Sequence, residues 1–124
     1  MFKNMMLVGF GSFFGGVVRY LVTRMLSAMV VSSYPLGTFA VNVLGCFIIG
    51  FVSALPVGSL LSPNTRLLLT TGLCGGFTTF STFMNENATL LKDGMPTTAL
   101  LYTFASFLLG FLAVVGGQQA ARIF

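Results

Sequence analysis

The sequence predicts an all-α integral membrane protein with four transmembrane helices. Of its 124 residues, 56% are hydrophobic and only 6% are charged, which is far too apolar for a soluble domain of this size. A transmembrane helix takes roughly 20 apolar residues, and short polar breaks divide the chain into four runs of that kind. We therefore predict one four-helix membrane domain over residues 1–124, with spans at about 5–29, 36–55, 65–91 and 97–121.

Proline, glycine and serine mark the ends of these spans. Pro35 disfavours helix at the residue before it, so the first span should end before the break from Ser32 to Pro35. The second span should stop at Pro56 to Ser59, and Ser62 to Asn64 is typical of a turn that leads into the third. A turn from Lys92 to Pro96 then separates the third span from the fourth.

The third span contains the least lipid-like sequence of the chain, Thr-Thr-Gly-Leu-Cys-Gly-Gly-Phe-Thr-Thr-Phe-Ser-Thr-Phe from Thr70 to Phe83. Such sequence is tolerated at membrane depth only where protein or a polar cavity covers it. Each glycine weakens a helix by roughly 1 kcal/mol relative to alanine, so we expect a helix interruption around Gly75 to Thr79. The carbonyl groups freed by such a break can coordinate a cation such as Na⁺. A tight crossing between two helices is the alternative interpretation.

Small residues in two of the spans predict close helix contacts. Gly11 and Gly15 in the first span, and Gly72 and Gly76 in the third, have the small-xxx-small spacing that lets two helix backbones approach. Glycine is also common in membrane helices generally, so the spacing alone does not identify the partner of each helix.

Aromatic and hydroxyl side chains follow the expected interruption. Phe80 and Phe83 are three residues apart and so share a helix face. Because the edges of phenyl rings are electropositive, an edge-on pair can hold an anion in a dry site, although plain packing explains many aromatic stripes. The hydroxyl groups of Ser81 and Thr82 add further donors on other faces of the same short helix.

Five more polar residues lie in or near the spans. The amide of Asn42 can donate to a dehydrated anion or bridge two helices. Arg19 lies deep in the first span, where it either raises the anion concentration at a vestibule or snorkels to the interface. Glu86 lies towards the end of the third span, where it caps an ion path or pairs with Arg19. Tyr102 and Ser106 share one face of the fourth span, and Tyr102 also fits an interfacial aromatic.

Positive charge is almost balanced between the two sides of the membrane. Orientation normally follows an excess of Lys and Arg in the cytoplasmic loops, and here the split is three against two or three. The balance predicts that two oppositely inserted copies pair as an antiparallel homodimer, unless a few residues or a partner decide the orientation. One side carries Lys3, Arg66 and Arg122, and the other carries Arg24 and Lys92, with Arg19 if it reaches that interface.

Three motifs together resemble one known family over nearly the whole chain. They are Gly15 to Arg19, the pair Gly37-Thr38 leading to Asn42, and above all Gly72 to Phe83. With these motifs the chain resembles the small bacterial fluoride channels of the Fluc/CrcB family. Chain length, four spans and loop-charge balance agree with that resemblance.

The resemblance implies a dual-topology homodimer in the bacterial cytoplasmic membrane, with two fluoride pores and a structural Na⁺ at the interface between the broken third helices. It implies that Gly75 and Thr78 give backbone carbonyl groups to the Na⁺. Gly110 departs from the expected pattern, because some relatives should carry a hydroxyl there. The implied pore residues are Asn42, Phe80, Phe83, Ser81, Thr82, Tyr102 and Ser106, with Arg19 and Glu86 near the ends of the path.

The resemblance also implies passive, electrogenic fluoride efflux that lowers cytoplasmic fluoride and gives fluoride resistance. The alternative is a small proton-coupled exporter of cationic or guanidinium compounds, which needs a membrane-embedded carboxylate; Glu86 is the candidate. A non-transporting membrane subunit is a third hypothesis. The chain has no histidine and no nucleophile with a base partner, so we do not expect an enzyme. We also expect no nucleic-acid partner.

Overall fold

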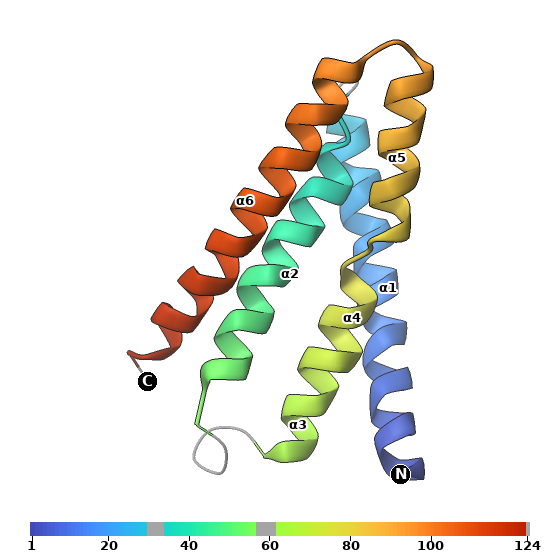
Figure 1. The fold of residues 1–124 in the computed structure, drawn as a ribbon. Coiled ribbons are helices and arrows are strands. Elements are labelled where there is room, and N and C mark those ends of the chain that lie inside the picture. Colours follow the sequence, from blue (N-terminus) through green and yellow to red (C-terminus); the bar gives the residue numbers. More distant parts are fainter. Residues whose placement is uncertain (30–33, 57–61, 124) are drawn as a thin grey trace.

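A computed structural model describes residues 1–29, 34–56 and 62–123, and these residues form helices joined by short turns (Figure 1). Four helical segments of this described part are long and apolar enough to cross a membrane, which confirms the predicted all-α fold with four spans. The first, second and fourth are α1 (Phe2–Met29), α2 (Leu36–Ala54) and α6 (Pro96–Ala121). The third comprises α3 (Pro63–Leu67), the π-helix η1 (Leu68–Cys74), α4 (Gly75–Phe77) and α5 (Ser81–Lys92).

Local chemistry sets the ends of the later helices. The side chain of Ser62 accepts a hydrogen bond from the backbone N–H of Thr65, so it caps the start of α3. Gly94 has a φ of 74°, a left-handed conformation that glycine adopts without strain, and it turns the chain between α5 and α6. Two parts of the predicted breaks, Ser32-Ser33 and Val57 to Ser59, lie outside the described residues.

The interruption of the third span lies later in the chain than its glycines suggest. Helix continues through Gly75 and Gly76 to Phe77, and the break comprises the three residues from Thr78 to Phe80. The predicted interruption around Gly75 to Thr79 is therefore confirmed at Thr78 and Thr79, and it is wrong for Gly75 to Phe77, which are helical. The reason is that Gly76 allows a helix crossing: a Cβ added there would lie 2.6 Å from the carbonyl oxygen of Ser12.

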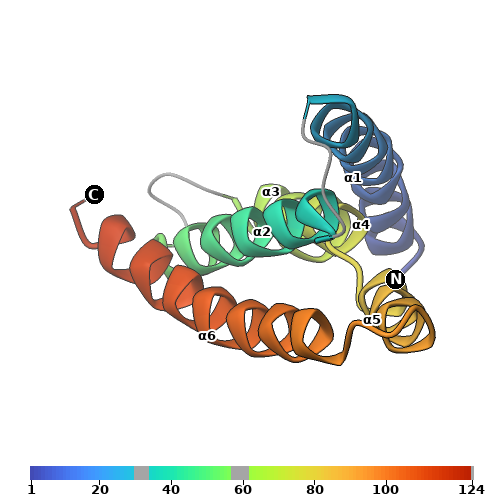
Figure 2. The same cartoon turned by 90° about the horizontal axis from the view of Figure 1, so that it is seen from above.

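The helices pack mainly in two places, one on each side of α2. α6 lies along one side of α2, and α1 lies on the other, against η1 and α4 (Figures 1 and 2). The beginning of α1, the end of α6 and the start of α3 lie at one end of the molecule, and the turn between α5 and α6 lies at the opposite end (Figure 1). This arrangement brings the break beside the middle of α2.

The contact between α1 and the third span depends on glycine. A Cβ added at Gly15 would fall against the carbonyl oxygen of Leu73 and lie 2.8 Å from the backbone nitrogen of Phe77. A Cβ at Gly11 would lie 2.9 Å from the Cα of Gly72. The close contact predicted from the small-xxx-small spacing is thus confirmed, and the two backbones touch with no side chain between them.

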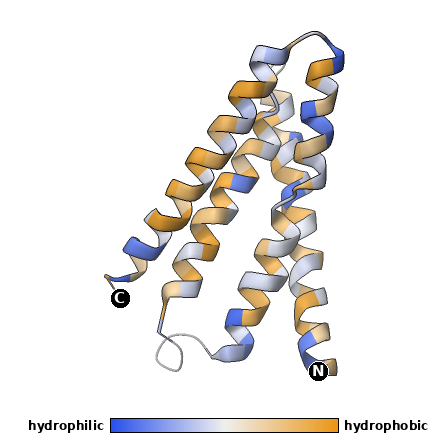
Figure 3. Ribbon diagram, viewed as in Figure 1, coloured by the Kyte–Doolittle hydropathy of each residue, from blue (hydrophilic) through white to orange (hydrophobic). Residues whose placement is uncertain are grey.

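The outward faces of the bundle are apolar. Large hydrophobic side chains of α6, including Leu100, Phe104 and Leu112, are exposed in the chain as described. Figure 3 shows hydrophobic residues along most of α6 and α2, and hydrophilic residues mainly towards the helix ends. Lipid hydrocarbon is an apolar solvent, so such faces are expected of a membrane protein.

An alanine at the glycine crossing should separate α1 from the third span. Gly15→Ala places a methyl group against backbone atoms that cannot rotate away, so we expect a loss of about 1–3 kcal/mol in the free energy of unfolding. The measurement is unfolding of the purified protein by SDS in mixed micelles. Gly9→Ala is the matched control, because a Cβ at Gly9 meets nothing within 4 Å. Equal stability of the two variants would contradict the crossing.

Candidate functional site

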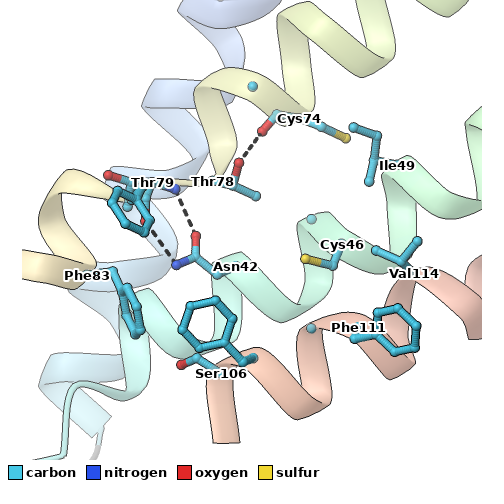
Figure 4. Close-up of a pocket in the computed structure, with 15 residues that line it drawn as sticks. Asn42, Cys46, Ile49, Cys74, Thr78, Thr79, Phe83, Ser106, Phe111 and Val114 are labelled. Atoms are coloured by element: carbon cyan, nitrogen blue, oxygen red, sulfur yellow. Dashed lines mark hydrogen bonds between the residues drawn. The ribbon is translucent and has the colours of Figure 1, made fainter. Parts of the chain in front are cut away.

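The side chain of Asn42 holds the backbone of the break. Its Oδ1 accepts a hydrogen bond from the backbone N–H of Thr79 at 2.8 Å, and its Nδ2 donates to the carbonyl oxygen of Thr79 at 3.0 Å. Figure 4 shows the two bonds as dashed lines between Asn42 on α2 and the chain at Thr79. A primary amide has one acceptor and two donor hydrogens, so it replaces, for one residue, both hydrogen bonds that a continuous helix would supply.

Threonine hydroxyl groups satisfy further backbone groups around the break. The Thr78 hydroxyl and the Thr78 N–H both donate to the carbonyl oxygen of Cys74, at 2.8 and 3.0 Å, and close the end of α4. On the other side, the N–H of Thr82 donates to the Thr79 hydroxyl at 3.4 Å, and that hydroxyl donates to the hydroxyl of Thr82 at 3.2 Å. The first turn of α5 is thereby capped from within the break.

The bond from Thr79 to Asn42 takes away the donor that the Gly75 carbonyl group would have in a continuous helix. In a continuous α-helix the N–H of residue i+4 donates to the carbonyl of residue i, so Thr79 would donate to Gly75. Here that N–H is held by Asn42. Gly75 and Thr78 both line the cavity beside the break, and freed carbonyl oxygens of a broken membrane helix suit a cation such as Na⁺. The donor set at the break therefore fits the predicted ion.

Arg19 has a partner that the sequence did not predict. Its Nε donates to the carbonyl oxygen of Gly76 at 3.0 Å, so the guanidinium lies at the end of α4 instead of extending to the membrane surface. The suggested pairing of Arg19 with Glu86 is wrong, because the carboxylate of Glu86 is bonded elsewhere. A cation at the carboxyl end of a helix is electrostatically favourable, which is the physical reason for the observed contact.

A cavity of about 500 Å³ lies beside the break, between α2, α4 and α6 (Figure 4). Its lining is mostly apolar, with a few amide, hydroxyl and thiol groups. It includes six of the predicted pore and cation-site residues, and it does not include Ser81, Thr82, Tyr102, Arg19 or Glu86. The lining residues are Asn42, Gly45, Cys46, Ile49, Cys74, Gly75, Thr78, Thr79, Phe80, Phe83, Ser106, Phe107, Gly110, Phe111 and Val114.

The two predicted aromatic residues have different environments. The centroids of the Phe80 and Phe83 rings are 6.1 Å apart, so the structure brings them together. Phe83 is only 4% exposed and meets Tyr102 in an edge-to-face contact with centroids 4.9 Å apart. Phe80 is 67% exposed and lies at the rim of the cavity. The Phe83 ring is therefore held by its neighbours, whereas the Phe80 ring is largely uncovered in the single chain.

Glu86 joins three helices through hydroxyl groups. Its Oε2 accepts a hydrogen bond from the hydroxyl of Thr38 on α2 at 3.0 Å, and its Oε1 accepts from the hydroxyl of Tyr102 on α6 at 2.9 Å. Tyr102 is completely buried. Sequence reasoning missed the contribution of Thr38, although a signal was present: Thr38 precedes Asn42 by four residues and so lies on the same face of α2.

The other end of the cavity is lined by a serine, a thiol and a glycine. The hydroxyl oxygen of Ser106 is buried and has no hydrogen-bond partner in the described part of the chain. One turn further along α6, a Cβ added at Gly110 would lie 3.5 Å from the sulfur of Cys46. The departure noted at Gly110 is thus accompanied by a thiol on the facing helix. Nothing in the sequence near Cys46 indicates that it lines a cavity, because a thiol in a span usually behaves as a small apolar residue.

Comparison with known proteins gives consistent matches over almost the full length. The family described as "CrcB-like protein, Camphor Resistance (CrcB)" matches residues 6–118. A fluoride-specific ion channel FluC of Chlorobium chlorochromatii (strain CaD3) is 48% identical over 120 residues, 96% of this chain and 92% of that protein. A channel of the same name from Chlorobaculum tepidum is 48% identical over 98% of this chain and 96% of its own length. A channel of the same name from Flavobacterium psychrophilum is 40% identical over 97% of this chain and 98% of its own length.

Loss of the Tyr102 hydroxyl should weaken the contact between α5 and α6. Tyr102→Phe leaves a partly buried oxygen of Glu86 without its donor, which should lower the free energy of unfolding by about 1–3 kcal/mol. Unfolding by SDS in mixed micelles measures the change. Tyr20→Phe is the control, because Tyr20 is exposed on α1 and its hydroxyl accepts a hydrogen bond from the exposed Arg24. An unchanged unfolding midpoint for Tyr102→Phe would show that the bond adds no net stability.

Proposed function

Because this chain belongs to the CrcB-like protein family, we propose that it is a fluoride-specific ion channel of the bacterial cytoplasmic membrane. Transport is passive and electrogenic: fluoride leaves the cell down its electrochemical gradient, which lowers cytoplasmic fluoride and gives fluoride resistance. The main support is the 48% identity to a fluoride-specific ion channel over 96% of this chain. The chain is a multi-pass membrane protein with four spans in its described part, as such a channel requires.

The path for fluoride begins in the cavity beside the break. A dehydrated ion needs fixed dipoles that replace its hydration shell, and the Ser106 hydroxyl lines the cavity with no partner among the described residues. Asn42 uses one N–H hydrogen on Thr79 and keeps a second one. The ring edges of Phe80 and Phe83 add positive potential. Fluoride gains most from a tight site of this kind, because chloride is larger and binds hydrogen-bond donors less strongly.

The start of α5 extends this path. Ser81 and Thr82 are the first two residues of α5, where the positive end of the helix dipole favours an anion. Their hydroxyl groups add donors to the same place. The path therefore runs from an amide and phenyl edges to the amino end of a helix, and no full positive charge traps the ion there.

Charged residues lie nearer the two ends of the path. Tyr102 continues it towards Glu86, whose carboxylate oxygens accept hydrogen bonds from Thr38 and Tyr102. These two donors offset the negative charge that an anion would otherwise meet. Arg19 supplies positive charge at the end of α4, and this charge attracts fluoride towards the break.

A second copy of the chain, inserted in the opposite orientation, covers the cavity in this proposal. Irregular backbone at membrane depth must be covered by protein or a polar cavity, whereas Phe80 at the rim is largely exposed in the single chain. The charge balance also supports dual insertion. Because Arg19 is bonded at the break, it does not count among the positive charges near a membrane surface. Three such charges then lie near one surface (Lys3, Arg66 and Arg122) and two near the other (Arg24 and Lys92).

A structural Na⁺ lies between the two copies in the same proposal. Gly75 and Thr78 supply backbone carbonyl oxygens from each copy. Hard cations take several oxygen ligands, so the two carbonyl groups of one chain are too few and two copies complete the set. The bound ion offsets the partial negative charge of the carbonyl groups and holds the two broken helices together.

Purified protein in liposomes should release fluoride without any other component. We expect rapid electrogenic fluoride efflux and no measurable chloride efflux, recorded with ion-selective electrodes after valinomycin and K⁺ set the potential. Guanidinium transport without fluoride flux would favour the proton-coupled exporter, in which Glu86→Gln should abolish transport. In a channel the same substitution should only slow fluoride. Absence of any flux would favour a non-transporting subunit.

Loss of either phenyl edge should slow fluoride. We expect Phe80→Ile and Phe83→Ile each to reduce fluoride efflux by about tenfold or more, since about 1.4 kcal/mol of lost stabilisation at the barrier slows passage tenfold. Phe104→Ile is the matched control, because Phe104 is 69% exposed on the outer face of α6. Phe80 is also largely exposed, so its substitution should not unfold the protein. Normal flux through both variants would contradict the role of the ring edges.

A further inference from the structure

Three carbonyl oxygens around the break accept hydrogen bonds from other groups of the chain. The Cys74 carbonyl oxygen accepts from the N–H and hydroxyl of Thr78. The Gly76 carbonyl accepts from Arg19, and the Thr79 carbonyl accepts from Asn42. The Gly75 carbonyl differs from these three, because its helical donor, the N–H of Thr79, is bonded to Asn42 instead.

From this division we infer that Asn42 is a positioning residue of the cation site. By holding the N–H of Thr79, it keeps that donor away from the Gly75 carbonyl and leaves the carbonyl oxygen available to a cation. By accepting from that N–H it also fixes the peptide between Thr78 and Thr79, and by donating to the Thr79 carbonyl it fixes the next peptide. The inference rests on the Na⁺ site of the proposed function, and it gives Asn42 a second role that is separate from donation to fluoride.

A competing structure explains why such a residue is needed. An unpaired N–H at membrane depth is costly, so without Asn42 the N–H of Thr79 should return to the Gly75 carbonyl and extend α4 by one residue. The extended helix would satisfy the backbone and remove a ligand from the cation. Asn42 therefore selects the broken form over a continuous helix that the chain can otherwise make.

Arg19 acts on the neighbouring carbonyl group from the opposite side. Its Nε donates to the carbonyl oxygen of Gly76, and the positive guanidinium repels a cation from this oxygen. Asn42 on α2 and Arg19 on α1 thus hold the carbonyl groups of Thr79 and Gly76, whereas Gly75 and Thr78 are the ligands of the proposed site. Only Asn42, however, controls a donor that competes for Gly75, and so the affinity for the cation should depend on Asn42.

The experiment compares Na⁺-dependent thermal stabilisation of the purified protein, titrated against N-methyl-D-glucamine at constant ionic strength. Asn42→Leu has a similar volume and no hydrogen-bonding group, so we expect its Na⁺ midpoint to rise by about 10–100-fold, as for other residues that orient metal ligands. Asn85→Leu is the matched control, because Asn85 is exposed on α5; its midpoint should equal that of the wild type.

A second substitution tests the mechanism directly. Proline has no N–H, so in Asn42→Leu/Thr79→Pro no donor at residue 79 can return to Gly75. Thr78 already has φ −93° and ψ 159°, the extended conformation that a residue before proline prefers. We expect the double variant to regain a Na⁺ midpoint close to that of the wild type, although its fluoride flux should stay low because the Asn42 amide is absent.

The outcomes separate this inference from the proposed function. If the wild type is stabilised by Na⁺ and Asn42→Leu keeps the same midpoint, the inference is overturned and the cation site stands. If proline gives no recovery, the role of the Thr79 N–H is overturned. If the wild type shows no response to Na⁺, the cation site and this inference both fail, while fluoride efflux from liposomes still decides the channel function. Should Asn42→Leu fail to fold alone, recovery of a folded, Na⁺-responsive protein by Thr79→Pro supports the inference.

Discussion

The pair of hydrogen bonds between the Asn42 side chain and the Thr79 backbone is the interaction on which the broken span depends. Lipid offers no partner to a free peptide group, and each unsatisfied group costs several kcal/mol. A break inside a membrane helix therefore needs a polar side chain from another helix at the right depth. α2 can supply it only because it runs beside the break (Figure 1).

The glycine contacts position the second polar partner. Because Gly11 and Gly15 lie directly on the backbone of the third span, Arg19, one turn further along α1, reaches the end of α4. The continuous helix from Pro63 to Phe77 directs its carboxyl end, and so the negative end of its dipole, at that guanidinium. Close packing and electrostatics thus favour the same arrangement, with Arg19 of α1 bonded to the end of α4 and Asn42 of α2 bonded to the break.

Local sequence signals predicted part of this structure. Hydropathy and the Pro and Gly breaks were enough for four spans, because these signals lie within each span. The place of the break was not predictable in the same way: Gly75 and Gly76 suggested an early break, but it follows Phe77, where Asn42 supplies hydrogen bonds from 37 positions away. The contacts Arg19 to Gly76 and Thr38 to Glu86 join positions 57 and 48 apart, and no local pattern encodes them. The roles of the lining residues remain predictions.

The even number of spans restricts how two such chains can be joined. The start of α1 and the end of α6 lie at the same end of the bundle (Figure 1), so a short linker from one chain to the next would give both halves the same orientation. In the proposed antiparallel pair the corresponding ends emerge on opposite faces of the membrane. A single-gene fusion of two copies would need a linker that itself crosses the bilayer, about 20 apolar residues long if helical. Separate chains avoid that requirement and leave the proportion of the two orientations to the insertion step.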